Sequence, residues 1–432
     1  MKKVIVFLVV FLLISSAAVT VYFLYFSSEV TGRWTSEEIL YEGPLPAEEG
    51  KCTLEFKAVK PYKNKFTALC SQWRIPERPF ELKDMPKGVS GDVSYFLPGL
   101  GDANMPAILT HTGKNRLYVD TDGDGYLSDE KALKAKTVKY RRFGSGRYYR
   151  FGPFSVEADD GTEKVTTKLY AQSYGIRSRT LAFYPSGYRV GKIRLGNKVY
   201  GVAVCDGNFD GRYDKRITLP IEKFFGSGDY DCFAIDFDQN GGFDWFHAGR
   251  SEIMRLSRMV KFDDSYYGIG VSADGGVLEL REVEPEFGTL EVEGDSAKMA
   301  LISDAASEYI SDFEQGQQLP VGRYAAIDIG INKVDSDGNK WTLGSYQKTG
   351  KLRDFEIRPS EVVTFKIGSP LVIKTTAERR DAIVAIGLYL EGQSGEQYGG
   401  QVKKSGKNVH RPGIKIRNES GEIIHSGNFE YG

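Results

Sequence analysis

The 432-residue chain contains only four histidines and four cysteines, and its formal net charge is −1. The histidines are His111, His247, His410 and His425. None of them stands at a metal-ligating spacing, and the chain has no nucleophile elbow and no phosphate-binding glycine loop. Because the charges balance, the molecule as a whole has no electrostatic reason to bind nucleic acid. The sequence therefore shows no catalytic motif and predicts no nucleic-acid partner.

Helical periodicity is also scarce, with residues 129–136 and 251–260 as the best short helical candidates. The chain is instead rich in residues of strands and turns, with 25 Tyr, 25 Phe and 49 Gly. Alternating apolar runs occupy residues 53–59, 188–195, 198–205, 266–271 and 277–280, and Gly-containing turns at 196–197 and 274–276 separate neighbouring runs. This pattern predicts a mainly β, antiparallel fold.

The N-terminus carries the clearest targeting signal. Lys2 and Lys3 precede an apolar run over residues 4–26 that is long enough, as a helix, to cross a bilayer. It is either an uncleaved anchor or a signal peptide cut after Ala18. We favour the anchor, because cleavage would leave an apolar new terminus. Residues 1–27 are thus expected to anchor the chain and 28–50 to form a tether, with the remainder on the extracytoplasmic side, or secreted if cleavage occurs.

Two acidic segments repeat one spacing, residues 206–214 (the second loop) and 236–244 (the third loop). Each places side-chain oxygens at positions 1, 3, 5 and 9 and glycine at position 6. Calcium takes about six to eight oxygen ligands, and the backbone carbonyl at position 7 supplies another one. The predicted ligands are Asp206, Asn208, Asp210, Arg212 and Asp214 in the second loop, and Asp236, Asp238, Asn240, Gly242 and Asp244 in the third.

An earlier segment, residues 120–130 (the first loop), has the same first half and places its later acids at positions 10 and 11. Its predicted ligands are Asp120, Asp122, Asp124, Glu130 and the backbone carbonyl of Tyr126. Each of the three loops follows an apolar run, so we expect all three to leave one sheet at the same edge. The alternative is that Asp, Asn and Gly recur here only as Asx turns. For residues 335–339, which lack an oxygen at position 9, we prefer a plain hairpin turn.

The three loops resemble the short calcium loops of the EF-hand, dockerin and thrombospondin type 3 families. That resemblance implies Ca²⁺ as the bound ion. The chain departs from the EF-hand pattern at position 12, which is Lys131, Ile217 or His247 where the EF-hand has Glu. Each ion then needs a further ligand from elsewhere or from water, so we expect weak binding of about 10⁻⁴ to 10⁻³ M.

The sequence divides after the acidic loops. Residues 51–288 form the predicted β-rich domain, and two series of short strands follow, at 289–368 and 369–432. Residues 319–324 (LPVGRY) resemble the turn-then-strand entry of prealbumin-like and carboxypeptidase-regulatory-type β-sandwich modules. The resemblance implies two small Ig-like sandwich modules. The whole chain also resembles exported bacterial proteins that combine such loops with terminal Ig-like modules.

The cysteines lack a Cys-x-x-Cys spacing, which argues against a thiol redox site or a structural zinc. Cys52 and Cys70 flank a turn-like stretch, and a cross-hairpin disulfide and two free thiols remain equally open. Cys205 and Cys232 are offset relative to the acidic loops, so we expect them on opposite strand faces and unbonded.

Residues 131–150 carry eight Lys and Arg without an acid, interleaved with aromatic residues. We interpret this strip as a solvated strand face. Its alternative role is to bind an anionic polymer or lipid head groups.

The sequence thus predicts a membrane-anchored, extracytoplasmic calcium-binding protein with a structural or interaction role and a polysaccharide or protein partner. The competing class is an exported carbohydrate-active hydrolase in which calcium is only structural. Its catalytic acids would be a pair such as Glu284 and Glu286, or Asp263 and Asp264.

Overall fold

The computed structural model describes residues 48–58, 70–73, 77–89, 92–100, 103–111, 115–140, 146–159, 164–173, 180–219, 230–243, 252–262, 264–306, 308–310, 316–346, 350–380, 383–398, 402–410 and 412–429. Within these residues the protein is mainly β, with one 3₁₀ helix, η2 (Gly350–Arg353), and no α-helix. No helix in this described part is long and apolar enough to span a membrane. The predicted anchor and most of the tether lie outside the described residues.

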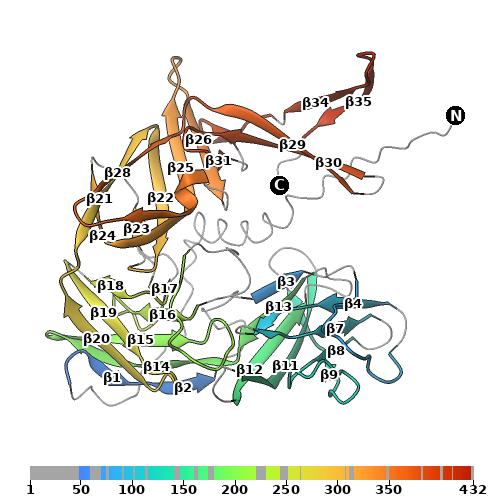
Figure 1. The fold of residues 1–432 in the computed structure, drawn as a ribbon, viewed down its shortest axis with the longest axis vertical. Helices are drawn as coiled ribbons and strands as arrows, with labels where there is room; N and C mark the ends of the chain where they lie inside the picture. The colour runs from blue at the N-terminus through green and yellow to red at the C-terminus, as the bar shows by residue number, and fades with distance from the viewer. Residues whose placement is uncertain are drawn as a thin grey trace. The chain divides into compact units, whose positions relative to one another are not determined.

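The strands fall into two compact units, one within Ser36–Glu284 and one within Pro285–Gly432 (Figure 1). The N-terminal unit has two five-stranded sheets. The first has the order β10 (Lys136–Tyr140), β11 (Gly146–Asp159), β12 (Lys164–Ser173), β13 (Thr180–Pro185), β3 (Cys70–Trp73). The second has the order β17 (Ile253–Arg255), β16 (Cys232–Ile235), β15 (Lys198–Cys205), β14 (Gly187–Leu195), β2 (Glu55–Ala58).

Three smaller sheets complete this unit. They are β1 (Lys51–Thr53), β20 (Val277–Val283), β19 (Ser265–Val271), β18 (Met259–Phe262); then β4 (Val93–Phe96), β7 (Ala107–Thr110), β8 (Arg116–Val119), β9 (Leu133–Lys134); and the pair β5 (Gly99–Leu100), β6 (Ala103–Asn104). The ladders between its described strands are antiparallel, as the turn chemistry predicted.

Most of the predicted strands of this unit are confirmed, and the two predicted helices are wrong. The run at 198–205 is β15, and the turn at 196–197 joins it to β14 as a hairpin. The helical candidate at 129–136 contains β9, and the candidate at 251–260 contains β17 and the start of β18. Both segments pair across ladders with strands distant in sequence, which overrides a weak local periodicity.

The core of the N-terminal unit reaches the acidic loops. One buried cluster joins Phe151 and Leu169 of the first five-stranded sheet to Leu117 of β8, and it includes Phe209 from the second loop. Phe209 is only 1% exposed, although its φ of 62° is unusual for a residue with a side chain. Burial of this ring therefore fixes the second loop to the body of the unit.

The structure decides between the alternatives left open for the cysteines and corrects one expectation, the opposite faces of Cys205 and Cys232. Cys52 is a free, buried thiol, so the Cys52–Cys70 disulfide does not form. Cys205 and Cys232 are direct partners in the β15–β16 ladder, so they share one sheet face and do not point to opposite faces. Both are free and fully buried, and burial raises the pKa of the Cys232 thiol to about 12. The register of β15 against β16 depends on all the residue pairs of the ladder. The positions of the two cysteines relative to the acidic loops do not determine it.

The basic strip runs along β9, β10 and β11, where β10 forms the edge of its sheet. Lys131, Lys134 and Lys136 are exposed, in agreement with a solvated strand face. Residues 141–145 of the strip lie outside the described residues. The anionic partner stays an untested alternative.

The C-terminal unit is sandwich-like. Its larger sheet has the order β23 (Glu308–Ile310), β22 (Ser296–Ser303), β25 (Gly322–Val334), β26 (Lys340–Tyr346), β32 (Lys403–Lys404), β33 (Lys407–Asn408), with β27 (Phe355–Ile357) paired to β25. A three-stranded sheet has the order β24 (Gln317–Pro320), β21 (Phe287–Gly294), β28 (Val362–Ile367), in which β21 and β28 run parallel. Leu290 and Phe365 from the smaller sheet share a buried cluster with Ile329 and Leu343 from the larger one.

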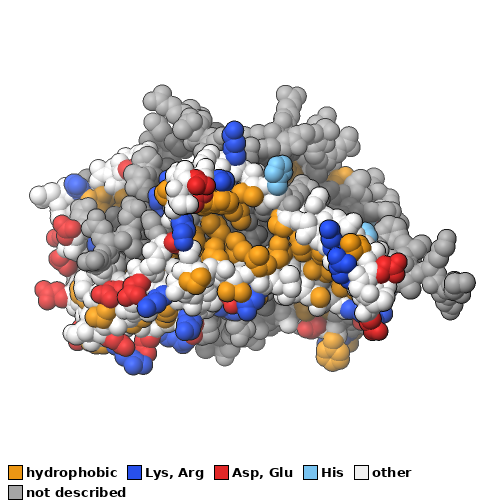
Figure 2. All heavy atoms as spheres, turned by 90° about the horizontal axis from the view of Figure 1, so that it is seen from above, with side chains coloured by type: hydrophobic (Ala, Val, Ile, Leu, Met, Phe, Trp, Pro, Cys, Tyr) orange, Lys and Arg blue, Asp and Glu red, His pale blue; other side chains and the backbone are white. Residues whose placement is uncertain are grey.

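Two further hairpins belong to this unit, β29 (Val372–Arg380) with β30 (Ile383–Glu391) and β31 (Gln397–Tyr398), and β34 (Gly413–Arg417) with β35 (Ile423–Asn428). The larger sheet takes strands from both sides of Gly368, and the division into two modules stays a prediction. The turn at 335–339 joins β25 to β26, which confirms the plain hairpin there. Several apolar side chains of this unit are exposed, among them Val362, Ile373 and Ile424, and Figure 2 shows hydrophobic side chains at the surface of the face in view.

Candidate metal sites

The three acidic loops, which share the spacing of their first seven positions, also share one hydrogen-bond scheme. The position-6 glycine N–H donates to Oδ2 of the position-1 aspartate, at 2.9 Å in the first loop, 3.0 Å in the second and 2.9 Å in the third. The position-7 N–H donates to the side chain at position 5, at 2.8 Å in all three. The glycines at position 6 have φ values of 84°, 82° and 82°. Each loop therefore curls in the same way around its alternate oxygen side chains.

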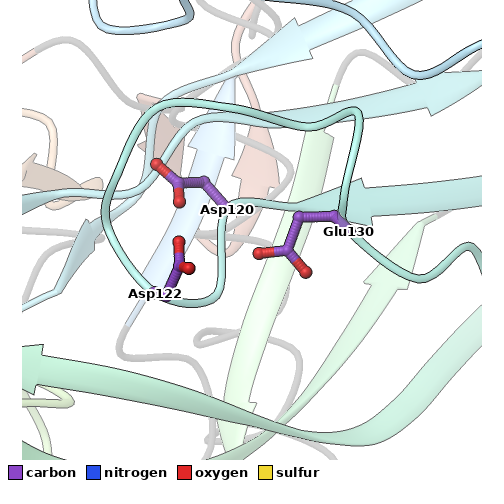
Figure 3. A group of neighbouring side chains, drawn as sticks. All are labelled: Asp120, Asp122 and Glu130. Carbon is purple, nitrogen blue, oxygen red and sulfur yellow. The ribbon is translucent and has the colours of Figure 1, made fainter.

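In the first loop, the structure brings Asp120, Asp122 and Glu130 together. One oxygen from each carboxylate lies within 4.8 Å of the others, and Figure 3 shows the three side chains gathered around the loop. Asp120 is 2% exposed, and burial raises its pKa and that of Glu130. Asp122 and Asp124 also gather with Asp129 at the exposed side of the loop. The first loop thus gathers three carboxylates that could hold a metal ion.

In the second loop, two buried oxygens have no hydrogen-bond partner. Oδ1 of Asp206 and Oδ1 of Asn208 are both buried atoms without one, and the residues are 2% and 5% exposed. The other carboxylate oxygen of Asp206 accepts hydrogen bonds from Gly211 and from the Thr167 hydroxyl, at 3.0 and 3.3 Å. Nδ2 of Asn208 donates to Asp210 at 2.6 Å, whereas the carbonyl oxygen of the same amide has no partner. A buried acceptor without a partner is costly, and a cation bound between these oxygens would satisfy both.

The electrostatics of the second loop agree with this geometry. Burial, and then the charge of Asp210, raise the pKa of Asp206 to about 7. Asp231, immediately before β16, is fully buried beside it, and burial raises the pKa of Asp231 well above its usual range. A raised pKa means that this poorly solvated place favours the protonated carboxyls when no cation is present, and a bound dication would favour their charged forms.

In the third loop, Asp236 and Asp238 gather with Glu252, and one oxygen of each lies within 4.8 Å of the others. Glu252 is 2% exposed although Asp238 is exposed. Burial raises the pKa of Asp236 to about 6. Asp244, the predicted position-9 ligand, lies outside the described residues.

Each loop also has a distant carboxylate that accepts a hydrogen bond from the N–H at position 2. Glu130 accepts it from Thr121, Asp231 accepts it from Gly207 at 2.9 Å, and Glu252 accepts it from Phe237 at 2.8 Å. Sequence reasoning missed Asp231 and Glu252, because the three acids follow position 1 at three different distances along the chain. Folding thus brings Asp231 and Glu252, which are distant in the chain, to the same backbone N–H position that Glu130 occupies within the first loop.

Other predicted ligands have different surroundings. Asp214 forms an ion pair with Arg212, whose Nε lies 3.2 Å from Oδ1 of the aspartate. The backbone carbonyls of Tyr126, Arg212 and Gly242 stay predicted ligands. Oδ1 of Asn240 accepts the position-7 N–H, and its amide donates to Asp238 at 2.9 Å.

The predicted common edge for the three loops is wrong. The first loop follows β8, which belongs to a different sheet from β15 and β16. β15 and β16 lie side by side and run antiparallel (Figure 1), so the second and third loops leave their sheet at opposite ends. An apolar run before a loop shows that a strand precedes the loop. It does not show in which direction that strand runs in the sheet, and this direction decides at which end the loop leaves.

The hydrolase alternative stays untested, because the structure does not show the two acid pairs named for it facing each other across a cleft. Glu284 and Glu286 are both exposed, and Asp263 lies outside the described part of the chain. His111 lies 2.7 Å from the hydroxyl of Ser94, through Nε2, and Ser94 is fully buried.

No family model, curated protein or solved structure matches this chain.

Proposed function

We propose that this protein is a membrane-anchored, extracytoplasmic calcium-binding protein, in which the three acidic loops bind the ion and stabilise the N-terminal β unit. In this proposal the C-terminal part forms two sandwich modules that extend or present the calcium-binding unit toward a polysaccharide or protein partner.

The observation that carries the proposal is the pair of orphaned oxygens in the second loop, by which we mean the buried acceptors Oδ1 of Asp206 and Oδ1 of Asn208, which have no hydrogen-bond partner. Plain Asx turns satisfy their side-chain oxygens with local backbone N–H groups. In the turn at 335–339 both oxygens of Asp335 are satisfied locally, Oδ1 by the Asn339 backbone N–H and Oδ2 by the side chains of Asn339 and Trp341. In the second loop, by contrast, Asp206 and Asn208 each keep a buried oxygen that nothing in the described structure satisfies.

The donor set favours calcium over other ions. All of the predicted ligands are oxygens, which suit hard cations and disfavour zinc. Magnesium usually keeps several waters, whereas the orphaned oxygens of the second loop are buried from solvent. Calcium also tolerates the irregular ligand arrangement of a curled loop.

Ion binding would add directly to the stability of the fold. The clustered carboxylates repel one another when no cation is bound. At the expected affinity, millimolar calcium is about one to ten times the dissociation constant, so each site that binds only in the folded state adds about 0.4–1.4 kcal/mol. The second loop is fixed to the core through Phe209, so closing that loop would stabilise the surrounding strands as well.

Thermal unfolding of the full-length protein in chelator and in millimolar calcium tests the proposal. We expect calcium to raise the melting temperature by about 5 °C or more. Asp206→Asn should remove a large part of that rise without lowering the melting temperature in chelator, because it replaces a buried charge by a neutral amide. Asp335→Asn is the matched control, since it changes an aspartate in a turn outside the three loops.

The control should lower stability equally in both conditions and leave the calcium-induced rise intact. A wild-type melting temperature that does not respond to millimolar calcium would contradict the proposal. An equal loss of the calcium response in both variants would also contradict it, because the effect would then not belong to the second loop.

A further inference from the structure

A cavity of about 480 Å³ lies against the second loop in the N-terminal unit. Asp206, Gly211, Arg212 and Tyr213 form one of its walls. The remaining lining comes from Val165–Lys168 of β12, from Pro185–Gly187 and Arg189, from Phe56 of β2, and from Ala273 and Asp274 in the β19–β20 turn. Its size is that of a small-molecule site.

The wall that the second loop provides is held in place by its neighbours. The Tyr213 N–H donates to the Ala273 carbonyl at 3.0 Å, and the Thr167 hydroxyl donates to Asp206 at 3.3 Å. A Cβ on Gly211 would lie 2.3 Å from Cγ1 of Val165, so the loop and β12 are in close contact. The cavity is therefore bounded by fixed elements, and one of them carries the proposed calcium ligands.

Two groups at this cavity have opposite unmet bonding needs. Oδ1 of Asp206 is a buried acceptor without a partner, and Nε of Arg189 is a buried donor without one. The Arg189 guanidinium is held over the Tyr213 ring, 5.6 Å from its centroid. A cation at Asp206 together with an anionic oxygen at Arg189 would satisfy both groups, and a carboxylate coordinated to calcium provides that combination.

The rest of the lining indicates what else the ligand carries. The lining holds three cationic residues, Lys168, Arg189 and Arg212, and two carboxylates, Asp206 and Asp274. Arg212 is paired with Asp214, and a bound dication would still leave the cavity with net positive charge. The lining also includes the hydroxyl-bearing residues Thr166 and Ser186, and the Thr167 hydroxyl, which donates to Asp206, keeps its acceptor lone pairs. Phe56 is 47% exposed and packs over Gly187, where a Cβ would lie 2.5 Å from the ring. An anionic polyol with one apolar face fits this lining.

We propose that this cavity binds a sugar carboxylate, a uronic acid unit, whose carboxylate bridges calcium in the second loop and the guanidinium of Arg189. The inference rests on the proposed function, because the ion supplies half of the carboxylate site. It makes an acidic polysaccharide the partner of this unit.

Isothermal titration of the full-length protein with D-glucuronate tests the inference, with D-glucose and inorganic phosphate as comparison ligands. We expect glucuronate to bind in millimolar calcium and its affinity to fall at least about tenfold in chelator. Glucose and phosphate should bind at least about tenfold more weakly, because glucose has no carboxylate and phosphate has no sugar ring.

Two variants assign the site. Arg189→Gln should weaken glucuronate binding about tenfold or more while the calcium-induced rise in melting temperature persists. Lys168→Gln, at an exposed position where folding is unaffected, should weaken it by a smaller factor. Arg281→Gln is the control, because its side chain is 80% exposed and does not line the cavity, and it should change nothing.

A normal calcium response without glucuronate binding would overturn this inference and leave the proposed function standing. Equal affinity for glucuronate in calcium and in chelator, or equal affinity for phosphate, would overturn the bridging role of the ion or the sugar class. Absence of any calcium response would overturn the proposed function, and the inference with it.

Discussion

The second and third loops have the same ligand spacing and the same backbone hydrogen bonds, but they differ in what surrounds them. The position-3 and position-5 side chains of the third loop are exposed, and Asn240 uses both ends of its amide within the loop. The second loop is packed against β12 and the core, and there Asp206 and Asn208 keep orphaned oxygens. Spacing therefore sets the curl of a loop, whereas the packing around the loop determines whether its oxygens stay buried without a hydrogen-bond partner.

The close packing of the second loop predicts the largest effect of a small substitution. Gly211→Ala would combine a φ of 82° with a Cβ 2.3 Å from Val165 Cγ1, and we expect a loss of about 3 kcal/mol in the free energy of unfolding. Gly123→Ala in the first loop is the control, because its φ is 77° but nothing lies within 4 Å of the added Cβ. It should cost about 1 kcal/mol. Equal losses in urea unfolding would refute the packing difference.

The pH dependence of stability separates the second and third loops next. A raised pKa in the folded state means that the folded protein binds the proton more tightly, so stability in chelator should fall as pH rises from the unfolded pKa to the folded one. For Asp206 that window runs from 3.8 to about 7, and for Asp236 from 3.8 to about 6. We expect a decline on the order of 2 kcal/mol over the wider window.

Asp206→Asn should remove the part of that decline that Asp206 contributes up to about pH 7, whereas Asp236→Asn should remove a part that ends at about pH 6. The raised pKa values of Asp231, Asp120 and Glu130 leave a residual decline in both variants. Denaturant unfolding in chelator across this range measures both. The quantity to compare is the free energy of unfolding of the wild type minus that of each variant, measured in chelator at each pH. A difference that rises between pH 5 and pH 7 would contradict the raised pKa values.

The smallest expected effect concerns Arg212. Its predicted ligand atom is a backbone carbonyl, and its side chain forms a partly exposed ion pair with Asp214. Such pairs contribute about 0.2–1 kcal/mol, so Arg212→Gln should lower stability in chelator by about 0.5 kcal/mol. The calcium-induced rise in melting temperature should remain. A large loss of that rise would show that the side chain, and not the carbonyl, serves the site.

The sequence predicted the local features of this protein well. The run at 198–205, the turns at 196–197 and 274–276, and the curl of the acidic loops all depend on residues that are close in the chain. Glycine at position 6 and aspartate at position 1 are sufficient to specify the shared hydrogen bond, because both lie within one turn.

The features that sequence reasoning missed depend on distant pairing. The partnership of Cys205 with Cys232 and the opposite exits of the second and third loops follow from the β15–β16 register. Glu252 and Asp231 reach their loops only through the same sheet, and no fixed spacing announces them. Weak helical periodicity at 251–260 gave way to the β16–β17 ladder for the same reason.

Crystals of the full-length protein grown in millimolar calcium, with anomalous difference data, test the central claim most directly. The account predicts a calcium peak in the second loop, at about 2.3–2.6 Å from Oδ1 of Asp206 and from Oδ1 of Asn208. An ordered second loop in such crystals, with no peak near these two oxygens, would contradict it.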